Sequence, residues 1–216
     1  MPGEEFHVNL TVDQLAAATG APRARAVTMM HGLNEALQEF GINTPERIGM
    51  FLANVGHESG RLRYLSELWG PTPQQRRYER DFTQPWAASN AANRLAFRLG
   101  NVAKGDGRRF AGHGFLQITG RYNHGVARDR LRARLPTLGV PDFEEAPSQL
   151  ATSLWGWMAA AEYAERTGCL VQADAGKFDA FCDLVNLGRV TTAEGDSNGY
   201  ADRLALWEGF QKAEGL

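Results

Sequence analysis

This chain has few cysteines and a net charge close to zero. Of 216 residues only Cys169 and Cys182 are cysteines, too few for the disulfide scaffold of a small secreted protein and not spaced as in a zinc finger. We expect two free thiols. The 23 Lys and Arg residues against 25 Asp and Glu residues leave a formal charge of -2, which gives no basic surface for nucleic acid. No nucleic-acid partner is therefore predicted.

Long apolar runs are missing as well. No stretch of about 18 apolar residues occurs, which argues against a membrane-spanning helix. The amino terminus, MPGEEFHVNL, is acidic and has neither the basic region nor the apolar region of a signal peptide. We expect a protein that is made and held in a cytoplasm and is not stably inserted in a membrane.

Several common catalytic motifs are also absent. The chain has no G-x-S-x-G elbow and no P-loop. His57-Glu58 begins like a zinc-protease motif, but the second histidine would stand at the position of Arg61. A zinc amidase assembled from distant histidines and a cysteine has no local spacing to support it.

Helical periodicity dominates what is present. The length suits one domain, so we predict a single domain over residues 1–216. Apolar stripes and end signals predict helices over residues 11–20, 22–41, 44–60, 90–99, 148–167, 175–186 and 199–212. Residues 115–119 alternate and are the one clear strand signal, while residues 70–114 and 120–147 are expected to be rich in loops.

Glu58 continues the apolar stripe of the helix expected from Thr44. Positions 48, 51, 52 and 55 carry Ile, Phe, Leu and Val, and position 58 follows on the same face. A carboxyl group there is poorly solvated, which raises its pKa and suits a proton donor. The alternative is a side chain that turns outward or pairs with an arginine such as Arg61.

Glu67 follows nine positions later and cannot share that face, because nine residues turn a helix by about 900°, half a turn out of phase. Gly60 is the expected stop, so Glu67 would lie on a following loop and stay hydrated. A protonated acid and a hydrated base hydrolyse glycosidic bonds with inversion when they are about 6.5–9.5 Å apart. Glu58 and Glu67 are therefore a candidate acid and base.

The expected strand carries two kinds of side chain. Leu116 and Ile118 would face the core, leaving Gln117 and Thr119 on the other face. An amide and a hydroxyl suit a sugar and a hydrolytic water. A half-exposed edge strand without a function produces the same alternation.

Five segments together resemble glycoside hydrolase family 19, the chitinase-like family, and in particular the compact endolysins of bacteriophages. They are HESG (57–60), SELWGPT (66–72), QQRRYE (74–79), GDGRRFAGHGFLQITGRYNH (105–124) and NG-x-x-DR (198–203). The resemblance implies a mainly α-helical, lysozyme-like α+β fold with a very small β element, bilobal with a central substrate groove. It also implies an inverting mechanism that needs neither a metal nor a cofactor.

The same resemblance assigns roles by position. It implies that Glu58 is the general acid, Glu67 the general base, and Thr119 a hydroxyl that helps to hold the attacking water. Substrate-binding positions are implied for Gln117, Tyr122, Asn123 and Asn186. Arg203 resembles an arginine near the acid, although an exposed helical arginine fits the sequence equally well. Trp69 and Tyr78 would stack on sugar rings or pack in the core.

Two positions depart from the family pattern. His113 stands where an arginine is more usual. Asn186-Leu187-Gly188-Arg189 replaces the common double glycine and is followed by extra loop residues up to Gly199. These departures bear on substrate contacts and leave the acid and the base in place.

Plant-type family members are secreted and rich in disulfides, so two cysteines and no signal peptide favour the phage type. The resemblance then implies a monomeric endolysin whose partner is the glycan strand of peptidoglycan. It would cut β-1,4 bonds to lyse the host, waiting in the host cytoplasm and acting in the periplasm and cell wall. No separate cell-wall-binding domain is expected. The alternatives are a chitinase acting on N-acetylglucosamine polymers, a lytic transglycosylase, or a glycan-binding module without turnover.

Overall fold

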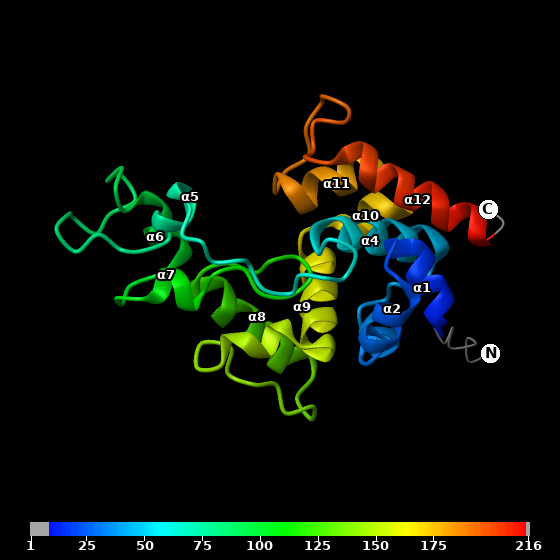
Figure 1. Cartoon of the computed structure of the whole chain (residues 1–216), viewed down its shortest axis with the longest axis horizontal. Coiled ribbons are helices and arrows are strands. Elements are labelled where there is room, and N and C mark those ends of the chain that lie inside the picture. Colours follow the sequence, from blue (N-terminus) through cyan, green and yellow to red (C-terminus); the bar gives the residue numbers. More distant parts are fainter. Residues whose placement is uncertain (1–8, 215–216) are drawn as a thin grey trace. The chain divides into compact units, whose positions relative to one another are not determined.

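The computed structural model describes residues 9–214 and divides the chain into two compact units (Figure 1). The first unit runs up to Tyr64 and resumes at Ala160, and the second spans Leu65–Ala159. Most of the amino-terminal segment used to argue against a signal peptide lies outside the described residues. A single catalytic domain over residues 1–216 stays a prediction.

Helices make up 55% of the structure and strand only 1%, which confirms the mainly α fold class. The described helices of the first unit are α1 (Val12–Thr19), α2 (Arg23–Met29), α3 (Leu33–Glu39), α4 (Pro45–Glu58), α10 (Cys169–Asp174), α11 (Phe178–Asn186) and α12 (Tyr200–Glu214). Those of the second unit are α5 (Pro73–Arg76), α6 (Arg94–Leu99), α7 (Asp106–Arg109), α8 (Arg121–Arg134) and the 3₁₀ helix η1 (Pro147–Ala151). The boundary at Ala159 and Ala160 falls inside α9 (Ser153–Arg166).

Local capping signals set the ends of α1 and α4 as predicted. Thr11 and Gln14 form a reciprocal capping box at the start of α1, and Gly20 ends that helix in the left-handed conformation. The Thr44 hydroxyl accepts a hydrogen bond from the N–H of Arg47 at 3.2 Å at the start of α4. Because these signals act within one turn, the sequence alone locates them.

The single helix predicted over residues 22–41 is wrong. The chain forms α2 and α3 instead, separated at Gly32, whose φ of 80° is left-handed and cannot continue a right-handed helix. Leu33, Leu37 and Phe40 of the predicted stripe are buried, but Val27 is 49% exposed, and Ala26 is the buried residue of α2. Periodicity therefore located the buried face of α3, and it missed both the interruption and the buried face of α2.

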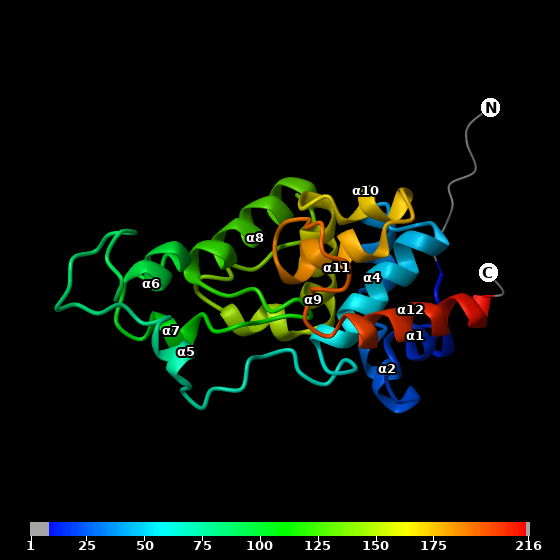
Figure 2. The ribbon, with the colours of Figure 1, turned by 90° about the horizontal axis from the view of Figure 1, so that it is seen from above.

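Helix α4 is the centre of the first unit and packs against α1, α10, α11 and α12 (Figures 1 and 2). At Gly49 the ring of Trp207 lies so close that an added Cβ would be 2.0 Å from its nearest carbon. The ring of Phe210 would be 2.5 Å from the same Cβ. A glycine therefore lets α12 pack directly on the α4 backbone.

In the second unit α5 packs on α7 and α6 on α8 (Figure 2). The loop predicted over residues 120–147 is wrong for its first half, which is the 14-residue helix α8. Its sequence, RYNHGVARDRLRAR, carries too few apolar residues to show a stripe. Its buried face consists mainly of small or polar residues: His124, Gly125, Ala127 and Leu131.

The predicted strand over residues 115–119 is also wrong. His113 and Ile118 pair through two backbone hydrogen bonds of 2.8 and 3.1 Å, and the residues between them form a turn. Gln117 takes a left-handed φ of 51°, which breaks the strand period of two. As a result Phe115 is the buried residue, stacked 3.9 Å from the ring of Trp157, while Leu116 is only half-buried.

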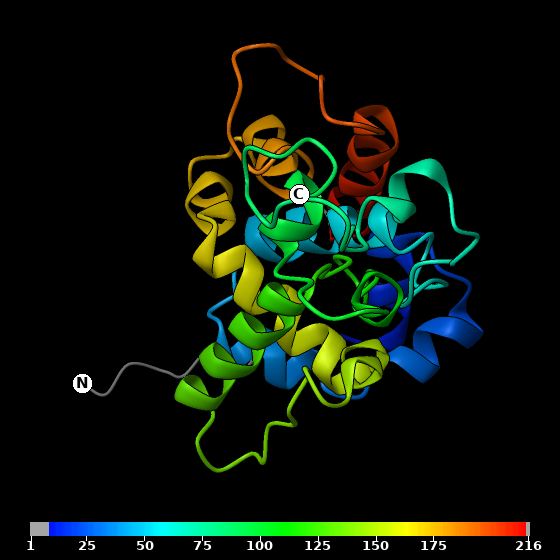
Figure 3. The ribbon, with the colours of Figure 1, turned by 90° about the vertical axis from the view of Figure 1, so that its left-hand side faces the viewer.

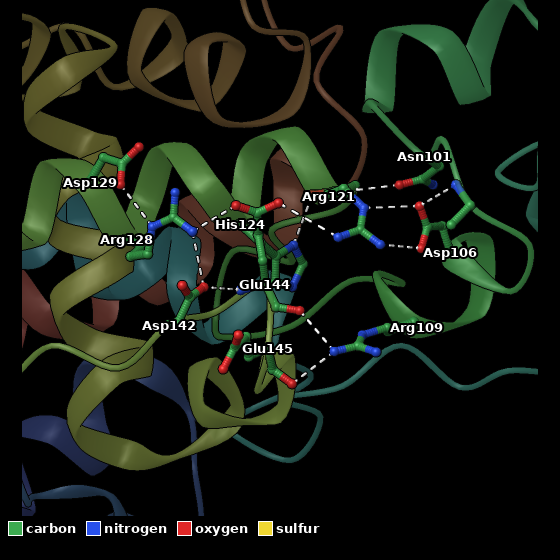
Figure 4. A network of polar contacts seen from close by, with 12 residues as sticks. Asn101, Asp106, Arg109, Arg121, His124, Arg128, Asp129, Asp142, Glu144 and Glu145 are labelled. Carbon is green, nitrogen blue, oxygen red and sulfur yellow. Dashed lines mark hydrogen bonds and ion pairs between the residues drawn. The ribbon is translucent and has the colours of Figure 1, made fainter.

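Ion pairs fasten α8 to its surroundings within the second unit (Figure 4). Arg121 donates to both oxygens of the buried Asp106 carboxylate, at 2.6 and 3.0 Å. Arg128 donates to Asp142 at 3.0 Å and to Glu144 at 2.6 Å. Leaving a buried charge such as Asp106 without its partner costs about 3–5 kcal/mol, whereas the carboxylates that pair with Arg128 are partly exposed. These contacts hold α8 against α7 and the segment before η1.

Two further features concern membrane-spanning helices and the state of the cysteines. No helix within residues 9–214 is both long enough and apolar enough to cross a membrane. Cys169 and Cys182 are free and buried, as predicted for two unpaired thiols. Burial raises the pKa of the Cys169 thiol to about 11 and that of Cys182 to about 12.

A buried histidine pair supports the turn before α8. The ring Nδ1 of His124 lies 2.9 Å from the carbonyl oxygen of Gly120, which can only accept, so Nδ1 is the donor. The Nε2 of neutral His124 is then an acceptor and receives a hydrogen bond from Nδ1 of His113 at 3.1 Å. Burial lowers the pKa of His124 to about 4, and burial also lowers the pKa of His113.

The pair predicts acid-sensitive stability. Between about pH 6.5 and pH 4 the unfolded chain protonates His124 and the folded chain does not, so the free energy of unfolding falls as the pH falls. The loss is on the order of 3 kcal/mol. In urea titrations across this range, His124→Gln should flatten the pH dependence, and the exposed control His31→Gln should keep it. An unchanged slope in His124→Gln would contradict the pairing.

Candidate active site

Glu58 is the last residue of α4 and forms an ion pair with Arg203 of α12. The Glu58 side chain keeps 24% of its surface exposed, while Arg203 is completely buried. Arg203 also donates to the side-chain oxygen of Asn54 at 2.7 Å and to the backbone oxygen of Asn198 at 3.1 Å. Arg203 therefore lies beside the candidate acid Glu58, and the alternative of an exposed helical arginine is wrong.

The chain leaves α4 through a turn that Asp202 holds. Gly60, Arg61 and Leu62 have left-handed φ values of 57°, 66° and 60°, an uncommon run for residues with side chains. Arg61 donates to both Asp202 oxygens, at 2.5 and 3.0 Å. His57 Nδ1 lies 2.7 Å from the same carboxylate. Arg61 thus pairs with Asp202, which fixes the turn after Glu58 and leaves Glu58 to Arg203.

Asn186 belongs to the same part of the first unit. Its side-chain oxygen accepts a hydrogen bond from the N–H of Asn198 at 2.9 Å. The backbone oxygen of Asn198 in turn accepts from Arg203. Asn186 is therefore connected to Glu58 through Asn198 and Arg203, and its carboxamide oxygen supports a loop.

Glu67 lies in the irregular segment that follows α4, as predicted, within the second unit. Both carboxylate oxygens accept hydrogen bonds: Oε1 from the Gln75 amide at 2.9 Å and Oε2 from the N–H of Gly112 at 3.0 Å. The N–H of Glu67 donates to the carbonyl oxygen of Gly112 at 2.7 Å. Glu67 is thus a half-buried carboxylate in a fixed orientation, held by neutral donors.

Gln75 positions the Glu67 carboxylate, and no role was predicted for Gln75 from the sequence. Its side chain is buried and donates to both Glu67 and the carbonyl oxygen of Leu68. Its side-chain oxygen accepts from the N–H groups of Gly70 and Thr72, at 3.2 and 2.8 Å. One amide therefore fastens the whole segment that carries Glu67. The signal in the sequence that could have identified Gln75 was its place eight residues after the candidate base Glu67.

Tyr78 and Trp69 adjoin this segment. Burial raises the pKa of the Tyr78 hydroxyl, and the nearby Glu67 carboxylate raises it further. The rings of Trp69 and Tyr78 are tilted by 47° with centroids 6.5 Å apart. Tyr78 therefore lies near the Glu67 carboxylate, and sugar stacking by either ring stays a prediction.

Hydrogen bonds connect three predicted residues in turn, from Asn123 to Thr119 and from Thr119 to Gln117. The Thr119 hydroxyl donates to the backbone oxygen of Gln117 at 3.1 Å, and the Asn123 amide donates to the backbone oxygen of Thr119 at 2.7 Å. The Gln117 side chain lies against Gly112, the residue that binds Glu67. Gln117 thus lies near Glu67 in the second unit, and Thr119 and Asn123 are connected to it by these hydrogen bonds.

Tyr122 and Asn123 are located differently from the prediction. Both were expected on a loop after the strand and instead occupy the first turn of α8. Tyr122 is 63% exposed and lies against Gly100. Its phenol ring is thus available to a ligand at the helix start.

Glu58 and Glu67 are carboxylates in contrasting settings, one in each unit. Glu58 contacts a buried cation, and Glu67 accepts hydrogen bonds from two neutral groups. Within residues 9–214 no cluster of three or more His, Cys, Asp or Glu side chains is arranged to hold a metal ion. Carboxyl groups can donate or accept protons in catalysis.

Comparison with known proteins identifies relatives in sequence and in structure. No family model matches the chain. Over 140 residues it is 31% identical to a "Glycosyl hydrolase family 19 domain-containing protein" of Haemophilus influenzae, a match that covers 58% of this chain and 68% of the relative.

Solved chitinases share the fold. Chitinase C of Streptomyces griseus superposes with a TM-score of 0.61 at 17% identity, covering 100% of this chain and 96% of that one. A bacterial family 19 chitinase, described as differing from plant enzymes, gives a TM-score of 0.60 at 21% identity over 95% of each chain. At these identities the likeness concerns the fold, and it supports the lysozyme-like class predicted from the sequence.

The buried position of Arg203 predicts a large stability loss on its removal. Arg203→Met would leave the Glu58 carboxylate and the Asn54 amide without their partner, and we expect the free energy of unfolding to fall by about 3 kcal/mol. Urea unfolding measures the change. The matched control Arg189→Met alters an exposed arginine and should stay within about 0.5 kcal/mol of the parent. Equal effects of the two variants would contradict the structural role of Arg203.

Proposed function

The chain belongs to glycosyl hydrolase family 19, and we therefore propose that it hydrolyses the β-1,4 glycan strands of bacterial peptidoglycan as a bacteriophage endolysin. It is a glycoside hydrolase with a mainly helical, chitinase-like fold. The observation that carries the proposal is that both candidate carboxylates are held by dedicated partners. Arg203 holds Glu58, and Gln75 with Gly112 holds Glu67.

In the proposed mechanism Glu58 is the general acid and Glu67 the general base. Glu58 donates a proton to the oxygen of the leaving sugar as the glycosidic bond breaks. Glu67 takes a proton from a water molecule that attacks the anomeric carbon from the opposite face, so the configuration inverts. Thr119, whose hydroxyl hydrogen is directed to the Gln117 carbonyl, offers its oxygen to that water. Gln117, Tyr122, Asn123 and Asn186 are assigned to sugar contacts.

The cysteine content supports peptidoglycan as the substrate. Cys169 and Cys182 are both buried and free, which differs from the disulfide-rich scaffold of plant-type chitinases. We propose that the enzyme is a monomer, stays in the host cytoplasm until lysis and then reaches the cell wall. Chitin is the second candidate, favoured by the solved chitinases that share the fold. Both polymers contain β-1,4-linked N-acetylglucosamine.

The fixed second carboxylate distinguishes hydrolysis from the remaining alternatives. A lytic transglycosylase needs one acidic residue, and a glycan-binding module needs none. Neither requirement explains why the Gln75 amide and the Gly112 N–H both bind Glu67. A general base held in one orientation does.

Each carboxylate should be required for turnover. Glu58→Gln and Glu67→Gln keep the side-chain shape and remove proton transfer, and each should lower the rate about 100-fold or more. Clearance of turbidity in a suspension of outer-membrane-stripped bacterial cells measures the rate. Glu208→Gln, an exposed change on α12, is the matched control and should clear at the parent rate. Parent-like clearance by either active-site variant would refute the assignment.

The products should carry the inverted anomer and an added water. Proton NMR during the first turnovers should show the α anomer from β-linked glycan, and mass spectrometry should show reducing ends. A β anomer formed first would indicate a retaining mechanism. Anhydro ends would identify a lytic transglycosylase, and cleavage of chitin oligosaccharides without cleavage of sacculi would identify a chitinase.

A further inference from the structure

The loop at residues 187–199, between α11 and α12, is fixed to one face of α11 (Figure 3). Asp179, Asp183 and Asn186 are spaced four and three residues apart, so their side chains project from the same side of the helix. Their oxygens accept four hydrogen bonds of 2.8–2.9 Å from loop groups. The donors are the N–H groups of Thr191, Gly195 and Asn198 and the hydroxyl of Ser197. The extra loop is therefore a preformed structure.

This loop forms one wall of a pocket of about 550 Å³ in the first unit. Val190 and Glu194 come from the loop, and the opposite lining comes from Lys177, Phe178, Asp179 and Tyr200. Ligand sites in proteins have volumes of about 300–1,000 Å³ and combine apolar surfaces with a few polar groups. The pocket has both properties.

The charged groups of the pocket are available to a ligand. Among the described residues neither the Lys177 ammonium nor the Glu194 carboxylate forms an ion pair or a side-chain hydrogen bond. Asp179 uses Oδ1 for the loop, and its Oδ2 has no partner in the described part of the chain. In the second unit, by contrast, the arginines at pocket-lining positions of α8 pair with carboxylates (Figure 4).

The uncharged residues that line the pocket favour a ligand with an aliphatic segment. The rings of Phe178 and Tyr200 lie with centroids 6.0 Å apart, and Phe178 is nearly buried while Tyr200 is half-buried. Val190 is 48% exposed and adds an aliphatic side chain to the lining. A ligand that satisfies every feature carries an ammonium, a carboxylate and an aliphatic segment.

We propose that this pocket binds the stem peptide of peptidoglycan through the free amino-acid end of its diaminopimelate-type residue. That end carries an ammonium for Asp179 and Glu194 and a carboxylate for Lys177, on an aliphatic chain that contacts Phe178 and Tyr200. Chitin has no peptide and offers neither charge. The inference rests on the proposed function, because it identifies the part of that substrate that distinguishes peptidoglycan from chitin.

The pocket is connected to the acid within the same unit. Asn198, at the end of the loop, accepts a hydrogen bond from Arg203, which holds Glu58. Gly199 lies against the His57 ring so closely that an added Cβ would be 2.0 Å from it. A peptide in the pocket would therefore be held by the loop that also reaches the catalytic acid.

Binding of a soluble stem tests the pocket directly. Calorimetry would use the tripeptide L-Ala-γ-D-Glu-meso-diaminopimelate and the analogue that ends in lysine, which lacks the second carboxylate. We expect the tripeptide to bind, and Lys177→Met and Glu194→Gln each to weaken binding at least about tenfold. Lys212→Met and Glu208→Gln change exposed groups of α12 and are the matched controls. Absence of binding, or equal binding by all variants, would overturn the proposal.

Hydrolysis separates this inference from the proposed function. The substrates are intact sacculi and the same glycan strands freed of peptides by an amidase. The ratio of the two rates, sacculi over bare strands, should fall about tenfold in Lys177→Met and stay at the parent value in Lys212→Met. An unchanged ratio with active enzyme overturns the peptide pocket and leaves glycan hydrolysis standing. Failure to cut either substrate overturns the proposed function, and tripeptide binding then decides the pocket alone.

Discussion

The buried guanidinium group of Arg203 is the contact on which the first unit depends. A guanidinium group removed from water needs hydrogen-bonding partners for its nitrogens, because an unpaired buried charge is far too costly to retain. Arg203 meets this requirement with Asn54 and Glu58 of α4 and with Asn198 of the loop before its own helix. A single side chain from α12 therefore fixes the end of α4, the carboxylate there and the loop at residues 187–199.

The second unit fixes its carboxylate in a different way. Glu67 does not lie in a helix, so its orientation depends on the Gln75 amide and the N–H of Gly112. Neutral donors can orient a carboxylate without an ion pair. The two proposed catalytic groups thus differ in their surroundings: a buried cation lies beside Glu58, and neutral donors lie beside Glu67.

Prediction from the sequence succeeded where one turn of the chain was sufficient and failed where distant residues decided. The caps of α1 and α4 and the irregular segment around Glu67 were predicted because their signals are local. Helix α8 was missed because it has too few apolar residues to show a stripe, and its arginines pair with Asp106, Asp142 and Glu144, which are distant in sequence. The alternation over residues 115–119 suggested a strand, but the left-handed φ of Gln117 turned it into a tight turn.

The sequence by itself determined the helical class, the two candidate carboxylates and the helix that ends at Glu58, since these follow from periodicity, capping and residue type. Only the tertiary structure decided the partners. Arg61, three residues from Glu58, pairs with Asp202, whereas Arg203, 145 residues away, pairs with Glu58. Tyr78 proved to lie near Glu67, and the extra loop proved to be the wall of a charged pocket. Periodicity reports which face of an element is buried, and it carries no information about which distant group completes a buried charge.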